Sequence, residues 1–179
     1  MIPYLALPRS INTGKRKVLK EDLLGIAKDV GFTEAKTYLA SGNLLLGGTH
    51  EGGAALEQVL EDALEARIGL RTDFMVRSLA DLRAIIDGNP FKAEAEDHPS
   101  HLIVTFLKAP LPKGDEEILR AANTGPERFA VAARELYIDF PISIADSLLD
   151  RDWKKTKRNP VGTTRNWNTV LKLAEMMGA

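Results

Sequence analysis

The chain contains no cysteine among its 179 residues. A disulfide framework, a thiolate nucleophile and cysteine-ligated zinc or iron–sulfur sites are therefore excluded. No apolar stretch approaches the roughly 20 residues that span a bilayer, so we expect no membrane association. The first twelve residues have a short apolar run without a basic region before it, which is not typical of a signal peptide. These absences predict a cytoplasmic protein.

The residues that are present have the composition of an ordinary globular protein, with 44% hydrophobic and 27% charged side chains. The net charge of −1 conceals an uneven distribution. Residues 1–20 carry five basic and no acidic side chains, residues 151–172 carry seven basic and one acidic, and residues 21–150 carry 12 basic and 23 acidic. Clustered basic charge attracts anionic ligands. The alternative is that these charges are solvated and balance over the folded surface.

Hydrophobic periodicity predicts the order of elements in the first half. A buried strand over residues 2–8 is followed by a helix in 19–32, two strand-like runs on either side of 41–43, a strongly periodic helix in 54–70, a strand in 71–77 and a helix from 78. Ser78 and Asp81 have the spacing of a capping box at the start of that last helix. This order is that of a ferredoxin-like, or split βαβ, unit.

The second half partly repeats this order, with a strand over 101–108, a helix in 114–123 and a second hairpin in 127–140, although no closing strand is evident. We therefore predict an α+β fold of two ferredoxin-like subdomains from an internal duplication, with a C-terminal helix. The expected subdomains are 1–90 and 101–179. The stretch 91–100, which contains proline and acidic residues, is expected to be the linker.

The stretch "TTRNWNTVLKL" (163–173) is interpreted as the start of the last helix. Trp167, Val170, Leu171 and Ala174 recur on one helical face, which indicates a core position for the tryptophan rather than a stacking platform. Thr163 or Thr164 is expected to cap the helix, which places Arg165 and Asn166 in its first turn. Because the helix dipole opposes an arginine there, another partner should favour it, and an anion at this helix start is one candidate.

A candidate ligand site follows from the predicted topology. In a ferredoxin-like unit, the loop after the first strand and the hairpin between the second and third strands lie at the same edge of the sheet. The glycine-bearing basic loop "PRSINTGKRKV" (8–18) and "SGN" (41–43) should then be neighbours and form a phosphate cradle, although the spacing of a Walker loop is absent. The candidate ligand-binding residues are Arg9, Asn12, Lys15, Lys17, Ser41, Asn43, Thr164, Arg165 and Asn166. The alternative is that Asn12 and Gly14 only shape a turn while the lysines stay in solvent.

Other chemistry has weaker support in the sequence. His98 and His101 have metal-ligand spacing but no third ligand at a fixed position, and so we predict no metal site. Ser41 is outside any GxSxG elbow and has no assigned base, so the catalytic residues and the cofactor stay unassigned. The acidic pair Glu61 and Glu65 indicates a solvated helix face.

Three stretches together resemble a bacterial family known only as domain of unknown function 1697: "YLALPRSINTGKRKV" (4–18), "GFTEAKTYLASGNLLL" (31–46) and "TTRNWNTVLKL" (163–173). The resemblance implies two ferredoxin-like halves and no established activity. This chain departs from the family pattern in the first loop, where Pro8 and Ser10 replace a usual leucine and glycine. It also has Leu148 where similar members carry a lysine, which implies an altered site if the family uses those residues.

Three classes of function remain open at this point. The leading hypothesis is the binding of a phosphate-bearing ligand, a nucleotide or a nucleic acid, through the first loop and the hairpin. The first alternative is a transferase or hydrolase that acts on a small anionic substrate, with Arg9, Lys15 and Arg165 as anion holders. The second alternative is a structural or assembly module whose exposed strand edge pairs with another copy. The oligomeric state is not indicated by the sequence.

Overall fold

The computed structural model describes residues 3–14, 16–48, 53–158 and 160–178. The chain divides into two compact units: unit 1 comprises Met1–Asp87 with Leu171–Ala179, and unit 2 comprises Gly88–Val170. This division differs from the expected subdomains in two places. The end of the chain returns to unit 1, and the stretch expected as a linker, residues 91–100, belongs to unit 2 and contains a helix, α4 (Lys92–Asp97).

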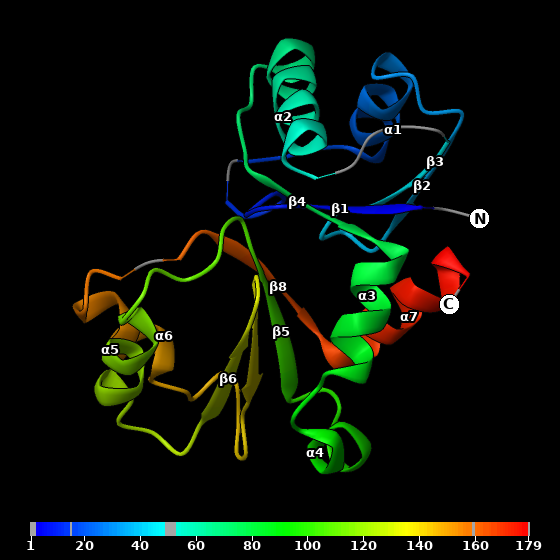
Figure 1. Ribbon diagram of the computed structural model, residues 1–179. Helices are drawn as coiled ribbons and strands as arrows, with labels where there is room; N and C mark the ends of the chain where they lie inside the picture. The colour runs from blue at the N-terminus through cyan, green and yellow to red at the C-terminus, as the bar shows by residue number, and fades with distance from the viewer. Residues whose placement is uncertain (1–2, 15, 49–52, 159, 179) are drawn as a thin grey trace. The chain divides into compact units, whose positions relative to one another are not determined.

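Unit 1 has one four-stranded antiparallel sheet with the strand order β2-β3-β1-β4. Its helices α1 and α2 lie on one side of the sheet, and α3 lies on the other side (Figure 1). The elements in chain order are β1 (Tyr4–Pro8), α1 (Lys20–Asp29), β2 (Glu34–Tyr38), β3 (Asn43–Gly47), α2 (Ala54–Ile68), β4 (Phe74–Ser78) and α3 (Leu79–Asp87). The central strand β1 is thus flanked by both β3 and β4.

The helices of unit 1 begin and end where local chemistry directs. The Ser78 hydroxyl accepts a hydrogen bond from the backbone N–H of Asp81, whose carboxylate in turn accepts one from the Ser78 N–H, so the predicted capping box is present. At the other end of the strongly periodic helix α2, Gly69 adopts a left-handed conformation with φ 69° and donates its N–H to the Glu65 carbonyl. Each of these signals is readable from neighbouring residues alone.

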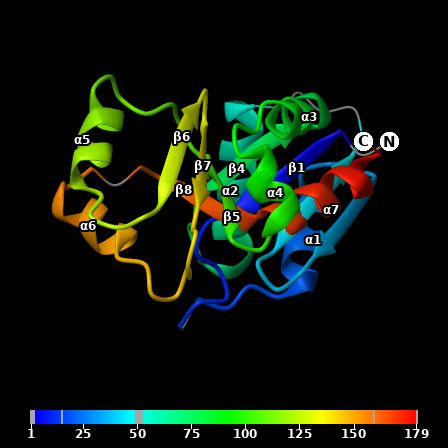
Figure 2. The ribbon, with the colours of Figure 1, turned by 90° about the horizontal axis from the view of Figure 1, so that it is seen from below.

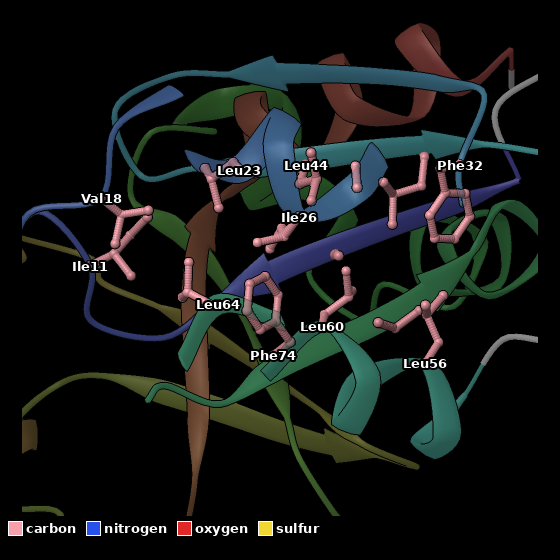
Figure 3. Close-up of a cluster of buried hydrophobic side chains, with 14 residues drawn as sticks. Ile11, Val18, Leu23, Ile26, Phe32, Leu44, Leu56, Leu60, Leu64 and Phe74 are labelled. Atoms are coloured by element: carbon pink, nitrogen blue, oxygen red, sulfur yellow. The ribbon is translucent and has the colours of Figure 1, made fainter. Parts of the chain in front are cut away.

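The core between α1, α2 and the sheet is apolar (Figure 3). Its fully or almost fully buried members are Ala6, Ile11, Val18, Leu23, Ile26, Ala27, Phe32, Leu44, Leu46, Leu56, Leu60, Leu64, Phe74 and Val76. Ile11 and Val18 come from the loop between β1 and α1, and Figure 3 shows their side chains beside each other. Burial of two side chains of this size contributes about 1.5–3 kcal/mol each, which anchors both ends of that loop.

Unit 2 has a second four-stranded antiparallel sheet with the order β6-β7-β5-β8, which is the strand order of unit 1. Figure 2 shows α5 and α6 together on one side of this sheet, where they cover a core that includes Leu107, Leu119, Phe129 and Leu149. The further elements are β5 (Leu102–Leu107), α5 (Asp115–Ala122), β6 (Arg128–Ala132), β7 (Glu135–Asp139), α6 (Leu149–Lys155), β8 (Gly162–Asn166) and α7 (Trp167–Met177).

The predicted fold class is confirmed: the chain is α+β, with two four-stranded antiparallel sheets and a C-terminal helix. Both sheets have the strand order of a split βαβ unit. A repeated order is what an internal duplication produces, and the duplication itself stays a prediction. Among the described residues, no helix combines the length and the apolar character needed to cross a membrane.

The closing strand of the second sheet was missed by sequence reasoning. β8 pairs with β5 and contains Thr164, Arg165 and Asn166, so these residues precede the last helix instead of forming its first turn. The helix is capped by Asn166, whose side-chain oxygen accepts the N–H of Thr169, and not by Thr163 or Thr164. The strand alternates between buried and exposed positions, but its buried residues are Thr163 and Arg165, so a search for alternating apolar residues does not find it.

The tryptophan at the start of α7 is buried as expected, with 4% of its surface exposed. The prediction that Leu171 lies on the same buried face is wrong. Leu171 is 41% exposed, because apolar residues at helical spacing outnumber the positions that the packed face can cover.

Glu61 is also placed differently from the sequence interpretation. It is 5% exposed, and its carboxylate accepts a hydrogen bond of 2.9 Å from the backbone N–H of Phe74. Glu57, one turn earlier on α2, accepts the N–H of Val76 in the same way at 2.9 Å. Because β4 is an edge strand, its outward N–H groups have no strand partner, and the two glutamates of α2 satisfy them.

Candidate functional site

The candidate site is built around the first loop, defined as residues 9–18 between β1 and α1. Asn12 fixes its shape, since its side-chain oxygen accepts the N–H of Val18 at 2.9 Å and its N–H donates to the Arg16 carbonyl at 2.6 Å. The same side chain reaches the hairpin between β2 and β3, where its Nδ2 donates to the Ala40 carbonyl at 2.7 Å. The first loop and the hairpin are therefore in direct contact.

Gly42 allows this close approach. It has φ 72°, and a Cβ atom at this position would lie 2.4 Å from the Ile11 Cδ1. A Cβ atom here would force the Ile11 side chain to shift and would require a positive φ that other residues rarely adopt, so glycine favours the close approach of the hairpin to the first loop. The conformation of the turn at residues 41–43 and the position of the first loop are thus coupled through this close approach.

The backbone of the first loop turns repeatedly through the left-handed region. Ser10, Asn12 and Gly14 have φ values of 49°, 55° and 58°. The N–H groups of Ser10 and Thr13 have no hydrogen-bond partner among the described residues. Alternation of this kind directs peptide N–H groups into one concavity, the arrangement known as an anion-binding nest. It also explains why glycine suits the position of Ser10, since a left-handed residue without a Cβ is unstrained.

Basic side chains surround this backbone. The Arg9 guanidinium lies 3.6 Å from the Asp73 carboxylate, with both side chains about two-fifths exposed. Lys17 is exposed, and Lys15 lies outside the described residues. Arg16, which sequence reasoning counted only as charge, donates from Nη2 to the Arg71 carbonyl at 3.1 Å, while its Nε is buried without a hydrogen-bond partner in the described part of the chain.

The two polar hairpin residues predicted to bind a ligand, Ser41 and Asn43, hydrogen-bond with each other inside the hairpin. Asn43 is the first residue of β3 and is fully buried, and its Nδ2 donates to the Tyr38 carbonyl at 2.8 Å and to the Ser41 hydroxyl at 3.1 Å. The side chain therefore closes the hairpin from inside. Ser41 is half-buried in the loop between the two strands, where Leu39 adopts a left-handed conformation with φ 62°.

The three C-terminal candidates belong to unit 2 and not to the unit of the first loop. Arg165 is 8% exposed and donates from Nη1 to the Thr163 hydroxyl and to the Thr164 carbonyl. Burial lowers the pKa of Arg165 to about 10. Thr164 and Asn166 are exposed on the alternate face of β8. We therefore build the candidate site from unit 1 alone.

A second polar cluster lies in unit 2 and holds α4 against β7. His98 is positioned between two carboxylates, with Nδ1 3.0 Å from Asp97 and Nε2 2.9 Å from the buried Asp139. Arg128 binds the other oxygen of Asp139 at 2.6 Å. The hydrogen bonds with Asp97 and Asp139 raise the pKa of His98. No group of three or more histidines and carboxylates in the described ranges has the arrangement of a metal site.

Comparison with known proteins gives a family and a fold. A family model described as a protein of unknown function (DUF1697) matches residues 1–137. The solved structure of the conserved bacterial protein SP0830 from Streptococcus pneumoniae is similar at a TM-score of 0.74, with 21% sequence identity, and covers 100% of this chain and 99% of its own. No curated protein matches the chain. At this identity, the structural likeness is evidence of a shared fold alone.

Proposed function

We propose that this chain, which belongs to the DUF1697 family of proteins of unknown function, binds a phosphate group of a nucleotide or nucleic acid where its first loop meets its β2–β3 hairpin. The observation that carries the proposal is the contact between Asn12 and Ala40 at 2.7 Å. It brings the basic segment and the tight turn to the same edge of the sheet, where one ligand reaches both.

The backbone of the first loop supplies neutral donors for such a ligand. Ser10 and Thr13 are exposed, and their N–H groups donate to no acceptor among the described residues, so they are open to phosphate oxygens, which are strong acceptors. Ile11 and Val18 hold the loop on the core, so the donors are arranged before the ligand arrives. A prearranged loop binds more tightly because less conformational entropy is lost on binding.

Arg16 is the charged residue best placed to complete the site. One side of its guanidinium is held by the Arg71 carbonyl and its Nε is buried, whereas its Nη1 donates to no acceptor in the described part of the chain and is left for a ligand. A guanidinium presents a planar fork that matches phosphate geometry. Arg9 adds a second positive charge, since its exposed ion pair with Asp73 at 3.6 Å is weak enough to be exchanged for a ligand contact.

Asn12 and Asn43 have positioning roles in this proposal. The first holds the loop against the hairpin and the second keeps the hairpin closed, so neither needs to touch the ligand. Lys17 is exposed beside the loop and contributes long-range attraction. The cytoplasm stays the proposed location, which cell fractionation with an antibody to the chain would test.

The test measures the binding of inorganic phosphate, ATP and a single-stranded oligonucleotide. Calorimetry or NMR gives the affinity of each at several salt concentrations. Phosphate contacts weaken as salt rises, so affinity should fall steadily between about 50 and 200 mM salt. Arg16→Ala should weaken binding at least tenfold and Lys17→Ala several-fold. Lys28→Ala is the matched control, because Lys28 is exposed at the opposite end of α1 and should leave affinity unchanged.

Two results would contradict the proposal. Binding that does not respond to salt would exclude a phosphate contact as its source. Equal affinities for the Arg16→Ala, Lys17→Ala and control proteins would place the ligand elsewhere on the molecule. A preference for the oligonucleotide over ATP at equal phosphate concentration would identify nucleic acid as the ligand class.

A further inference from the structure

Unit 2 contains a small hollow that plays no part in the proposed phosphate site. It lies between the turn that precedes β6 and the segment that follows β7. Its lining residues are Pro126, Glu127, Phe140, Pro141, Ile142, Ser143, Asp146 and Ser147. The two charged groups among them are both carboxylates, and most of the remaining lining is apolar. The lining of the hollow is therefore mostly apolar, and its two carboxylates give it negative charge.

The carboxylate of Glu127 has no hydrogen-bond or ion-pair partner among the described residues. Glu127 is 7% exposed, and its Oε2 is buried without any donor. A buried carboxylate without a donor is unfavourable, and proteins normally pair such a group with a cation or with N–H donors. Glu127 also lines the hollow, so its carboxylate group is complementary to a positively charged group that enters from outside the chain.

The turn around Glu127 holds this carboxylate in place. The side chain of Asn123 donates to the Glu127 carbonyl at 2.7 Å and accepts the Gly125 N–H at 3.1 Å. The Thr124 hydroxyl donates to the buried Asp152 on α6, and that hydrogen bond is the main cause of the lowered pKa of Asp152. Gly125 leaves room for the carboxylate, since a Cβ there would lie 2.0 Å from Oε2.

Size and chemistry select the ligand. The hollow has a volume of about 80 Å³, well below the roughly 300 Å³ of the smallest typical sites for drug-sized molecules. A space of this size suits one slender side chain. We propose that it binds the side chain of a lysine from a partner protein, with the ammonium group at Glu127 and the alkyl stem against Pro126 and Phe140.

The rim supports a protein partner over a free amine. Ile142 is 72% exposed, and Ile144 and Leu148 in the same segment are 41% and 44% exposed. Ile142 lines the hollow, and exposed apolar side chains that follow one another in a segment mark surfaces that bind other proteins. A lysine flanked by apolar residues has both a charge for the hollow and apolar surface for the rim. This site is independent of the proposed phosphate site, because all of its residues are in unit 2.

The test uses the whole protein and three probes. Two-dimensional NMR of the backbone amides measures the binding of each probe. The probes are the peptide acetyl-Leu-Lys-Leu-amide, its norleucine analogue and n-butylamine. We expect the lysine peptide to shift the amide signals of the lining residues. The norleucine peptide, which lacks the charge, should bind at least tenfold more weakly, and so should n-butylamine, which lacks the apolar neighbours.

Glu127→Gln removes the charge with little change of shape and should weaken binding of the lysine peptide at least tenfold. Glu117→Gln on the exposed side of α5 is the matched control and should bind like the wild type. Because the buried carboxylate is unpaired, Glu127→Gln should leave the stability of the free protein equal or higher. A clear loss of stability would show that the carboxylate already has a partner, and equal peptide binding by both variants would place the peptide elsewhere. Either result would overturn the proposal, as would tighter binding of n-butylamine than of the lysine peptide.

Discussion

Replacement of Glu61 by alanine is expected to destabilise the protein far more than a surface substitution on the same helix. Glu61 is 5% exposed and accepts the N–H of Phe74, itself fully buried, at 2.9 Å. A hydrogen bond to a charged group contributes about 1.5–3 kcal/mol, and the buried N–H left without an acceptor accounts for much of that loss. We therefore expect the free energy of unfolding to fall by about 2–3 kcal/mol.

The assay is equilibrium unfolding in urea, with the slope of the transition measured as well as its midpoint. Glu61→Gln keeps an oxygen acceptor and should lose about 1 kcal/mol. Glu65→Ala, one turn further along α2, removes only an exposed ion pair with Arg71 and should change stability by less than about 1 kcal/mol. If the Glu61 and Glu65 alanine variants were equally stable, the idea that α2 satisfies the edge of β4 would be refuted.

Three further predictions concern the two polar regions. Asn12→Ala should lower the free energy of unfolding by about 1 kcal/mol in urea titrations and weaken phosphate binding, because two of its side-chain hydrogen bonds hold the first loop; unchanged binding would remove its positioning role. Gly42→Ala should lose at least about 1–2 kcal/mol, since alanine at φ 72° is strained and meets Ile11; a thermal melt equal to that of the wild type would contradict this. The pKa of His98 is raised in the folded state above its ordinary value of 6.5, so its contribution to stability is complete below that pH and is lost as pH rises through the folded pKa. His98→Asn should remove this pH dependence in urea titrations at pH 5.5 and pH 8.5, and an unchanged difference between the two pH values would contradict the pairing with Asp139.

Much of the fold was predictable because its signals are local. The apolar spacing in α2, the glycine at its end and the capping box at Ser78 each depend on residues within one or two turns. The contact between the first loop and the hairpin was predictable indirectly. Local patterns predicted the strand order of a split βαβ unit, and that order places the two segments at the same edge of the sheet. By contrast, β8 was missed because its buried face has Thr163 and Arg165 where an apolar alternation was sought.

The candidate site was predictable in its location but less so in its residues. The basic loop and the turn at Gly42 were identified correctly as neighbours, while Asn43 is directed into the hairpin and Arg165 is buried in the other unit. Arg16 was overlooked as a site residue because its charge alone does not distinguish it from the neighbouring lysines. Only the packing of the first loop against Arg71 buries its Nε and sets it apart.

The sequence by itself determined the order of strands and helices in unit 1, the ends of several helices and the proximity of the first loop to the hairpin. Periodicity and capping act over a few residues, and topology then brings the ends of strands together. Only the tertiary structure decided which polar side chains are buried, as with Glu57 and Glu61 of α2, which accept hydrogen bonds from β4, and Glu127 beside its hollow. Burial depends on which distant segment packs above a residue, and that information is absent from the pattern of its neighbours.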